Sequence, residues 1–223
     1  MPTGALKINS LFVEAPRWTR RFLWLRWLAT PYELIASTLP TEGEILDLGC
    51  GHGLLALALA IGSSRRQVIG IDHDPERVRL AKSAALRLPT LVKPTFEVGD
   101  LKEKLGSFAS GSLACVAMID ILHYFDRPSQ HLLIGEAARA LAPDGVLAIR
   151  EIDSGAGIRA AANRLYEHVA TSVGFTKSAN ATLSFRAARE WTSLLEGAGF
   201  RVRSRACGAA LFADTLFLGQ KRL

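Results

Sequence analysis

Short apolar runs alternate with longer amphipathic stretches over the middle of the chain. The runs that predict strands are ILDLG just after Glu44, VIGID at 68–72, PTFEVGD ending at Asp100, SLACVAMID ending at Asp120 and GVLAIREID from Gly145. Helical patterns fall between them, from about Leu54, over 75–88 and over about 129–141. This alternation favours right-handed crossovers and a parallel sheet with helices on both faces.

Helical patterns also precede the first and the last predicted strands. One runs from Trp18 to Leu39 and is expected to break near Pro31, because proline lacks the backbone N–H that a helix interior needs. Another covers AREWTSLLEGAG and is followed by two strand patterns, FRVRSRACG and ALFADTLFLGQKR. We therefore predict an α/β fold with a doubly wound sheet of seven strands, mostly parallel, with an antiparallel C-terminal strand pair.

A single domain with two additions to the sheet is expected. The length of 223 residues and the hydrophobic share of 49% are ordinary for one globular domain with a substantial core. Residues 1–40 are expected to form an N-terminal helical lid. Residues 154–189, which are helical in places and rich in Ala, Ser and Asn, are expected to be a helical insertion across the carboxyl edge of the sheet.

Charge and cysteine content narrow the classes of partner and site. The net charge is +6, but the basic residues are scattered except near the N-terminus, so we do not expect nucleic acid as a partner. Cys50, Cys115 and Cys207 are widely spaced and lie outside any histidine cluster, which favours neither a disulfide framework nor a metal site. A reducing cytoplasm is therefore expected. Arg26 interrupts the apolar run near the N-terminus, which disfavours an export signal.

The stretch EILDLGCGHGLLALALA places three glycines at the first strand-to-helix turn. Open parallel sheets bind ligands at such turns, and glycine lets a ligand lie against bare backbone. A dinucleotide fingerprint that starts at Gly49 would need glycine where Leu54 stands, and no Gly-Lys-Ser/Thr of a phosphate loop follows. The turn therefore predicts a cradle for a ligand of another kind.

The motif LDLGCGHG resembles the glycine motif of the class I S-adenosylmethionine-dependent methyltransferases. The resemblance extends from about Glu44 through Asp153, with Asp72 closing the second strand, Gly99 and Asp100 the third, and AMIDILHYF the fourth. It is nearest to the small-molecule and the quinone or lipid-precursor methyltransferases. The resemblance implies a Rossmann-like sheet and S-adenosylmethionine as the cofactor.

The resemblance also implies the residues that contact this cofactor. Asp72 would hold the two ribose hydroxyls, a role that suits a carboxylate because it can accept two hydrogen bonds at once. The amino-acid part would face the glycine turn, namely Asp47, Gly49, Cys50, Gly51 and Gly53. The adenine would meet His73, Asp100 and Leu101, and the methionine portion would pass near Met118 and Ile119. For each acid alone, the alternative is a strand-end residue that caps the next helix.

The chemistry itself needs few residues. Methyl transfer from a sulfonium is an in-line displacement, so the protein aligns the acceptor and, where necessary, removes a proton. His123 and Tyr124, just past the fourth strand, are the candidate catalytic residues, and a structural or cofactor-side role is the alternative. The motif IDILHY departs from the Asn/Asp-Pro-Pro-aromatic motif of DNA and protein amide methyltransferases, which disfavours base or glutamine amide methylation.

The two additions to the sheet offer further candidates. In the insertion, polar side chains could face an acceptor or simply be solvated: Arg159, Asn163, Tyr166 and His168. In the N-terminal helix, the predicted apolar stripe that packs a lid over the cofactor is Trp18, Phe22, Leu25 and Ala29, with Arg17, Arg20 and Arg21 beside it. The alternative for this helix is weak contact with an anionic membrane surface or a lipid-like or carrier-bound acceptor.

The sequence thus predicts an S-adenosylmethionine-dependent methyltransferase that acts on a small-molecule or lipid-like acceptor. Oxygen is the expected methylated atom, with nitrogen and carbon left open. Two other classes are kept as alternatives, a nucleotide-dependent oxidoreductase on a similar sheet and a non-catalytic S-adenosylmethionine-binding module. The oligomeric state is not predicted.

Overall fold

The computed structural model describes residue 8 and residues 10–155, 183–208 and 213–222. Their strands form one sheet of the order β3-β2-β1-β4-β5-β7-β6. The strands are β1 (Gly43–Leu48), β2 (Arg66–Asp72), β3 (Thr95–Val98), β4 (Leu113–Ile119), β5 (Leu141–Ile152), β6 (Phe200–Ala206) and β7 (Asp214–Lys221). Strands β1 to β5 are parallel, and β7 runs antiparallel to both β5 and β6. The predicted fold class is confirmed.

Strand order reverses at the centre of this sheet. The chain moves outward from β1 through β2 to β3, and then returns to place β4 on the other side of β1. In open α/β sheets, ligands bind beyond the carboxyl ends of the strands at such a reversal. The topology therefore places the expected site above β1 and β4.

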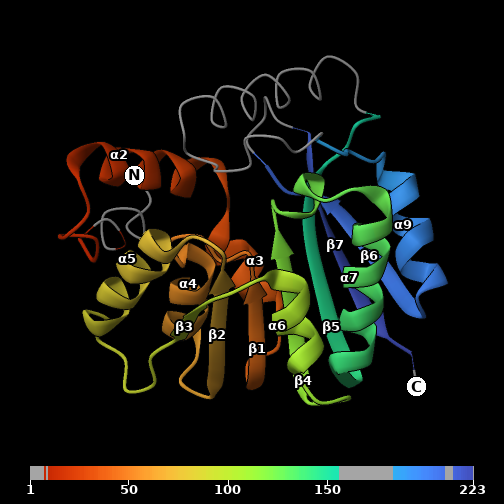
Figure 1. Cartoon of the computed structure of the whole chain (residues 1–223), viewed down its shortest axis with the longest axis horizontal. Coiled ribbons are helices and arrows are strands. Elements are labelled where there is room, and N and C mark those ends of the chain that lie inside the picture. Colours follow the sequence, from red (N-terminus) through yellow and green to blue (C-terminus); the bar gives the residue numbers. More distant parts are fainter. Residues whose placement is uncertain (1–7, 9, 156–182, 209–212, 223) are drawn as a thin grey trace.

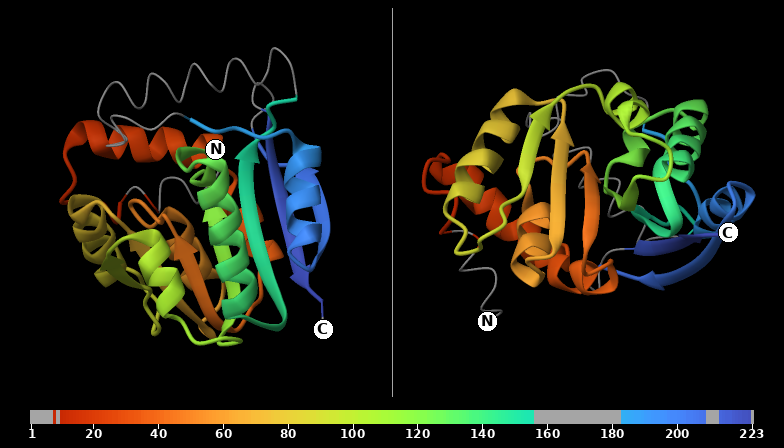
Figure 2. Two further views of the ribbon diagram at one scale, coloured as in Figure 1. Left: turned by 45° about the vertical axis from the view of Figure 1, so that its right-hand side comes forward. Right: turned by 90° about the horizontal axis from the view of Figure 1, so that it is seen from below.

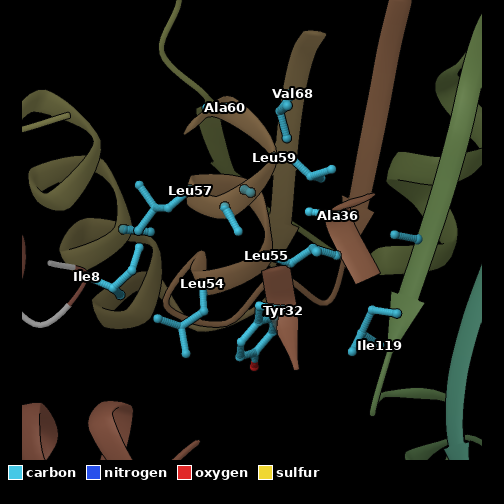
Figure 3. Packing of buried hydrophobic residues seen from close by; sticks show 14 of the residues in the cluster. Ile8, Tyr32, Ala36, Leu54, Leu55, Leu57, Leu59, Ala60, Val68 and Ile119 are labelled. Carbon is cyan, nitrogen blue, oxygen red and sulfur yellow. The ribbon is translucent and has the colours of Figure 1, made fainter. Parts of the chain in front are cut away.

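Helices cover both faces of the sheet (Figure 2). On one face lie α3 (Tyr32–Thr38), α4 (Leu54–Gly62) and α5 (Pro75–Leu86), and on the other α6 (Leu101–Ser107), α7 (Arg127–Ala140) and α9 (Ala188–Gly197). Figure 3 shows part of the hydrophobic core between the sheet and helices α3, α4 and α5, with Leu55 and Leu59 of α4 beside Ala36 of α3 and Val68 of β2. Successive residues of a strand contribute to the hydrophobic cores on opposite faces of the sheet, because side chains alternate along a strand.

The N-terminal helices confirm the expected break, because α2 (Arg17–Ala29) ends before Pro31 and α3 begins directly after it. Figure 1 shows α2 lying across the carboxyl ends of the strands. The predicted inward stripe of α2 is wrong, however. Trp18 is 62% exposed and Leu25 49%, whereas the buried residues are Thr19, Leu23 and Trp27.

Tertiary contacts explain this rotation of α2. The Trp27 ring packs on the Tyr32 ring of α3 at a centroid distance of 5.3 Å, and Nη2 of Arg26 lies 3.4 Å from Oδ2 of Asp120, just past β4. Tyr32 and Asp120 lie on the same side of α2. Because Trp27 and Arg26 turn toward them, Trp18 and Leu25 on the other side of the helix face outward.

Three further differences from the predicted elements bear on the site. Helix α6 was not predicted, and β3 ends at Val98, so Asp100 follows the strand and begins this helix. Residues 142–144, expected to lie between the helix that ends at about residue 141 and the strand that starts at Gly145, belong to β5, where Asp144 has a positive φ of 61° and the register with β4 shifts. Most of the predicted insertion, including its four polar candidates, lies outside the described residues.

Candidate functional site

A cavity of about 400 Å³ opens at the carboxyl ends of β1, β2 and β4, beneath α2. This volume is in the range of small-molecule sites. The predicted site residues that line it are Asp47, Gly49, Cys50, Gly51, Asp72, His73, Asp100, Leu101, Ile119 and Tyr124. Phe22 of the predicted lid stripe also lines it, together with side chains that were not predicted, notably Arg26, Tyr32, His52, Arg77 and Phe125. Of the predicted residues, Gly53, Met118 and His123 lie outside this lining.

The glycine turn is pinned to β2 by its own backbone. The N–H groups of Gly49 and Cys50 donate to the Ile71 carbonyl at 2.8 and 3.0 Å. A Cβ at Gly49 would lie 2.6 Å from the Ile121 side chain, whereas one at Gly51 would meet nothing within 4 Å. Gly51 also has a φ of +54°, which side chains rarely adopt. Gly49 is therefore required by packing, while Gly51 leaves open space for a ligand.

Asp47 presents a buried carboxylate at the wall of this cavity. It is 3% exposed, and its Oδ2 has no hydrogen-bond partner among the residues that the structure describes. Burial raises the pKa of Asp47 to about 7, the backbone N–H of Ala56 opposes this shift, and the charge of Asp72 adds to it. A buried acceptor without a donor is costly. The ammonium of an amino-acid group would satisfy it, so Asp47 and Gly51 together fit the expected cofactor.

Asp72 joins the glycine turn to the residues that follow β2. Its Oδ2 accepts from the N–H of Gly51 at 2.8 Å, and its Oδ1 accepts from the N–H of Asp74 at 2.9 Å. The half-exposed imidazole of His73 lies beside it, with Nδ1 3.4 Å from Oδ1. A carboxylate has about four acceptor positions, so these backbone bonds leave capacity for ligand hydroxyls at the cavity.

Asp100 and Leu101 form another part of the wall. Oδ1 of Asp100 accepts from the N–H groups of Lys102 and Glu103 at 2.9 and 3.0 Å, which makes Asp100 the N-cap of α6. The helix-capping alternative is confirmed for this acid. Both residues still line the cavity, so capping and ligand contact are compatible.

Met118 and Ile119, two predicted site residues at the end of β4, lie on opposite faces of the sheet. Met118 is fully buried in the cluster that contains α6 and α7, whereas Ile119 points to the opposite face and lines the cavity. Asp120 follows with a positive φ of 56°. Its carboxylate contacts Arg26 of α2 and the buried Arg150 of β5, so the ends of three elements are tied together at the cavity wall.

Sequence reasoning missed Arg26 and Arg150 as parts of this site. Arg150 donates to Asp120, to Asp214 of β7 at 2.6 Å and to the Cys207 carbonyl at 2.7 Å. No local motif marks either arginine, because their partners come from distant parts of the chain. His52 was also missed, although its place between two motif glycines was a usable signal.

His52 is a neutral cavity residue at ordinary pH. Burial, together with the charges of Arg77 and Arg26, lowers the pKa of its imidazole to about 4. Its ring lies 6.4 Å from the Phe22 ring of α2. Burial also raises the pKa of the neighbouring Cys50 thiol, so this side chain stays protonated.

His123 and Tyr124 occupy different positions although they are adjacent in sequence. Tyr124 lines the cavity, whereas His123 is 1% exposed and lies behind it, with ring centroids 4.2 Å apart. Nδ1 of His123 lies 2.8 Å from Oε2 of the buried Glu151. Oε1 of Glu151 accepts from the N–H groups of Leu122 and His123. Glu151 therefore fixes both the loop and the imidazole.

The order of the sheet and the cradle after β1 define a class of α/β proteins that bind a nucleoside-containing cofactor at the carboxyl edge of the sheet. Residues 17–205 match the family model described as a methyltransferase domain. The chain belongs to this family, the class I S-adenosylmethionine-dependent methyltransferases. The predicted family is confirmed, S-adenosylmethionine is the cofactor, and the oxidoreductase alternative is not supported.

Several relatives share this similarity. The release factor glutamine methyltransferase of Vibrio cholerae is 34% identical over 119 residues, 51% of this chain and 40% of that protein. The ubiquinone biosynthesis O-methyltransferase of Xanthomonas oryzae is 32% identical over 117 residues, 52% of this chain and 46% of that protein. The chain thus spans less than half the length of either relative.

A solved structure shows the same fold over nearly the whole chain. Magnesium protoporphyrin IX methyltransferase from Synechocystis, with bound SAH, superposes with a TM-score of 0.68 at 15% identity, covering 99% of this chain and 95% of that one. At this identity the likeness concerns the fold alone. Among the residues that the structure describes, no helix is long and apolar enough to cross a membrane.

Proposed function

We propose that this protein transfers the methyl group of S-adenosylmethionine to a small-molecule or lipid-like acceptor, at oxygen. The observation that carries the proposal is the cavity itself, which joins a polar cradle at Asp47 and Gly51 to an apolar wall from α2 and the loop after β4. The cradle fits an amino-acid group and a nucleoside. The apolar wall fits an acceptor with hydrocarbon or aromatic character.

Within this proposal, each part of the cavity wall has a separate task. Asp47 accepts from the ammonium, and the open space at Gly51 admits the amino-acid part. Asp72 accepts from the ribose hydroxyls, while Asp100 and Leu101 contact the adenine. Gly53, Met118 and His73 support or flank this site. When bound, S-adenosylmethionine supplies an electrophilic methyl group.

The residues of this chain then position the acceptor as its oxygen anion, whose proton has passed to solvent before the methyl group is transferred. Ile121 and Phe125 exclude water at the apolar end, and Tyr124 lines the cavity beside them, where we assign its side chain to orient the acceptor. His123 is buried behind Tyr124 against Glu151, so we assign it a positioning role for this tyrosine and its loop.

The choice of oxygen and of a small or lipid-like acceptor has three supports. The apolar wall offers Phe22, Leu23, Ile121 and Phe125 around Tyr124. In addition, one relative is a ubiquinone biosynthesis O-methyltransferase. The loop IDILHY lacks the Pro-Pro-aromatic sequence of amide methyltransferases, and its N–H groups at Leu122 and His123 are held by Glu151.

The three free cysteines support the expected cytoplasmic location.

Titration calorimetry and a labelled transfer assay test this proposal. We expect S-adenosylmethionine to bind and NADH not to bind, and label from the cofactor methyl group to appear on a phenol or quinol bearing an alkyl chain. Transfer to a matched amine but not to the phenol would contradict oxygen methylation. Cofactor binding without transfer to any acceptor class would favour the non-catalytic binding module.

Cofactor affinity should depend on pH through Asp47. Since the pKa of this carboxyl is raised to about 7 by burial, the free protein holds it protonated below about pH 7 and charged above. An ammonium stabilises only the charged form, so binding at lower pH must release a proton. Affinity should therefore rise with pH by up to about tenfold per pH unit and level off above about pH 7.

Calorimetry in two buffers of different ionisation enthalpy measures the proton released by this binding. The Asp47→Asn variant should bind more weakly and lose the proton release below about pH 7. Equal proton release in the parent protein and in this variant would show that another group carries the dependence. His52 is not the expected source, because its pKa of about 4 lies below this range.

A further inference from the structure

Helix α2 presents an exposed face with large apolar side chains. Its Trp18 is 62% exposed, Leu25 49% and Leu28 43%. The opposite face, with Leu23 and Trp27, is buried in the core. Large apolar side chains that gather on one exposed helix face mark an interaction surface more often than isolated ones do.

Basic residues share this outer face. At about 100° per residue, Arg17, Trp18, Arg21, Leu25 and Leu28 fall within an arc of about 100°. All five are exposed. The helix sequence RWTRRFLWLRWLA contains no acidic residue. The outer face of α2, defined by these five residues, is therefore both apolar and positively charged.

We propose that the outer face of α2 binds the surface of an anionic lipid bilayer, with the helix axis parallel to the membrane plane. Tryptophan and leucine side chains insert at the boundary between headgroups and acyl chains, and arginine heads reach the lipid phosphates. Reversible membrane binding by a surface helix uses both signals, apolar burial and charge. The outer face of α2 carries three large apolar side chains and two arginines.

The inner side of α2 faces the cavity, so membrane docking by the outer face would place the cavity close to the lipid. Phe22, Leu23 and Arg26 of α2 line the cavity. A helix that lies on the bilayer therefore brings the cavity within one helix diameter, about 10 Å, of the lipid phase. Acceptors that partition into the membrane would reach the apolar end of the cavity from there. The docking itself rests on the exposed face and not on the proposed methyl transfer.

Co-sedimentation with lipid vesicles tests the docking on the full chain without substrate. The protein should sediment with vesicles of phosphatidylcholine and phosphatidylglycerol and not with vesicles of phosphatidylcholine alone, and added salt should weaken the binding. Replacement of both outer arginines (Arg17→Gln with Arg21→Gln) should weaken it about 25-fold, which corresponds to about 1 kcal/mol per arginine. Replacement of the exposed tryptophan (Trp18→Ser) should weaken it as well.

A matched charge control lies on the edge strand β6, where Arg201 and Arg203 are both exposed. Their double replacement (Arg201→Gln with Arg203→Gln) should leave vesicle binding close to that of the parent. Equal weakening by both pairs would show unspecific attraction by net charge and overturn the assignment to α2. Absence of vesicle binding in the parent would overturn it outright, and so would a dimer that dissociates in Trp18→Ser without any vesicle binding. Cofactor affinity, measured in parallel, reports separately on the proposed function.

Discussion

The Arg150→Met variant should lose about 3–5 kcal/mol of unfolding free energy, because it removes the guanidinium shared by the buried carboxylate of Asp214 and the partly buried carboxylate of Asp120. Arg150 is 3% exposed and bridges Asp120 and Asp214, and it also donates to the Cys207 carbonyl. A buried acid that loses its charged partner keeps its desolvation cost without compensation. Urea denaturation measures this loss.

Two companion variants make the Arg150 result specific. Arg201→Met removes an exposed arginine from β6 and should change the unfolding free energy by no more than about 0.5 kcal/mol. Adding Asp214→Asn to Arg150→Met should recover part of the loss, because one of the two carboxylates is then neutral. A loss below about 1 kcal/mol in Arg150→Met would show that the network does not carry this energy.

The Asp72→Ala variant should bind S-adenosylmethionine about ten- to a hundredfold more weakly. Hydrogen bonds to a charged acceptor contribute roughly 1.5–3 kcal/mol, and this residue is proposed to accept from the ribose. It should also lower the unfolding free energy, because the N–H groups of Gly51 and Asp74 lose their acceptor. Calorimetry and urea denaturation on the same variant measure the two effects separately.

Asp126→Ala is the control for the structural part of this effect. Asp126 caps α7 by accepting from the N–H of Ser129 at 2.9 Å and lies outside the lining of the cavity. Its loss should cost about 1 kcal/mol of stability and leave cofactor affinity unchanged. If Asp72→Ala behaved in the same way, with lower stability and unchanged affinity, the proposed ribose contact would be refuted.

Much of the fold could be read from the sequence because its signals are local. The strands show as short apolar runs, and the break between α2 and α3 shows as Pro31, since periodicity and proline act within a few residues. Helix α6 was missed because its seven residues, LKEKLGS, are too few for a clear helical period. Strand β5 was predicted to start only at Gly145, because Pro143 and Asp144, which lie at its bulge, are residue types common in turns.

The sequence predicted some parts of the candidate site and not others, for the same reason. The glycine turn and the acids after β1, β2 and β3 were predicted, and all of them line the cavity except Gly53. The different positions of His123 and Tyr124 were not predicted, because they depend on Glu151, 28 residues further along the chain. The sequence names the residues of that loop, but their burial depends on β5.

The sequence by itself determined the order of the strands and of most helices, the glycine cradle and the acids at the strand ends, because each is encoded within a few consecutive residues. Only the tertiary structure decided which side of α2 faces the core. That choice rests on contacts such as Arg26 with Asp120, which are 94 residues apart, and Asp120 with Arg150, which are 30 apart. An amphipathic helix with arginine and tryptophan around most of its surface can pack in more than one rotation, so its distant partners select the one that occurs.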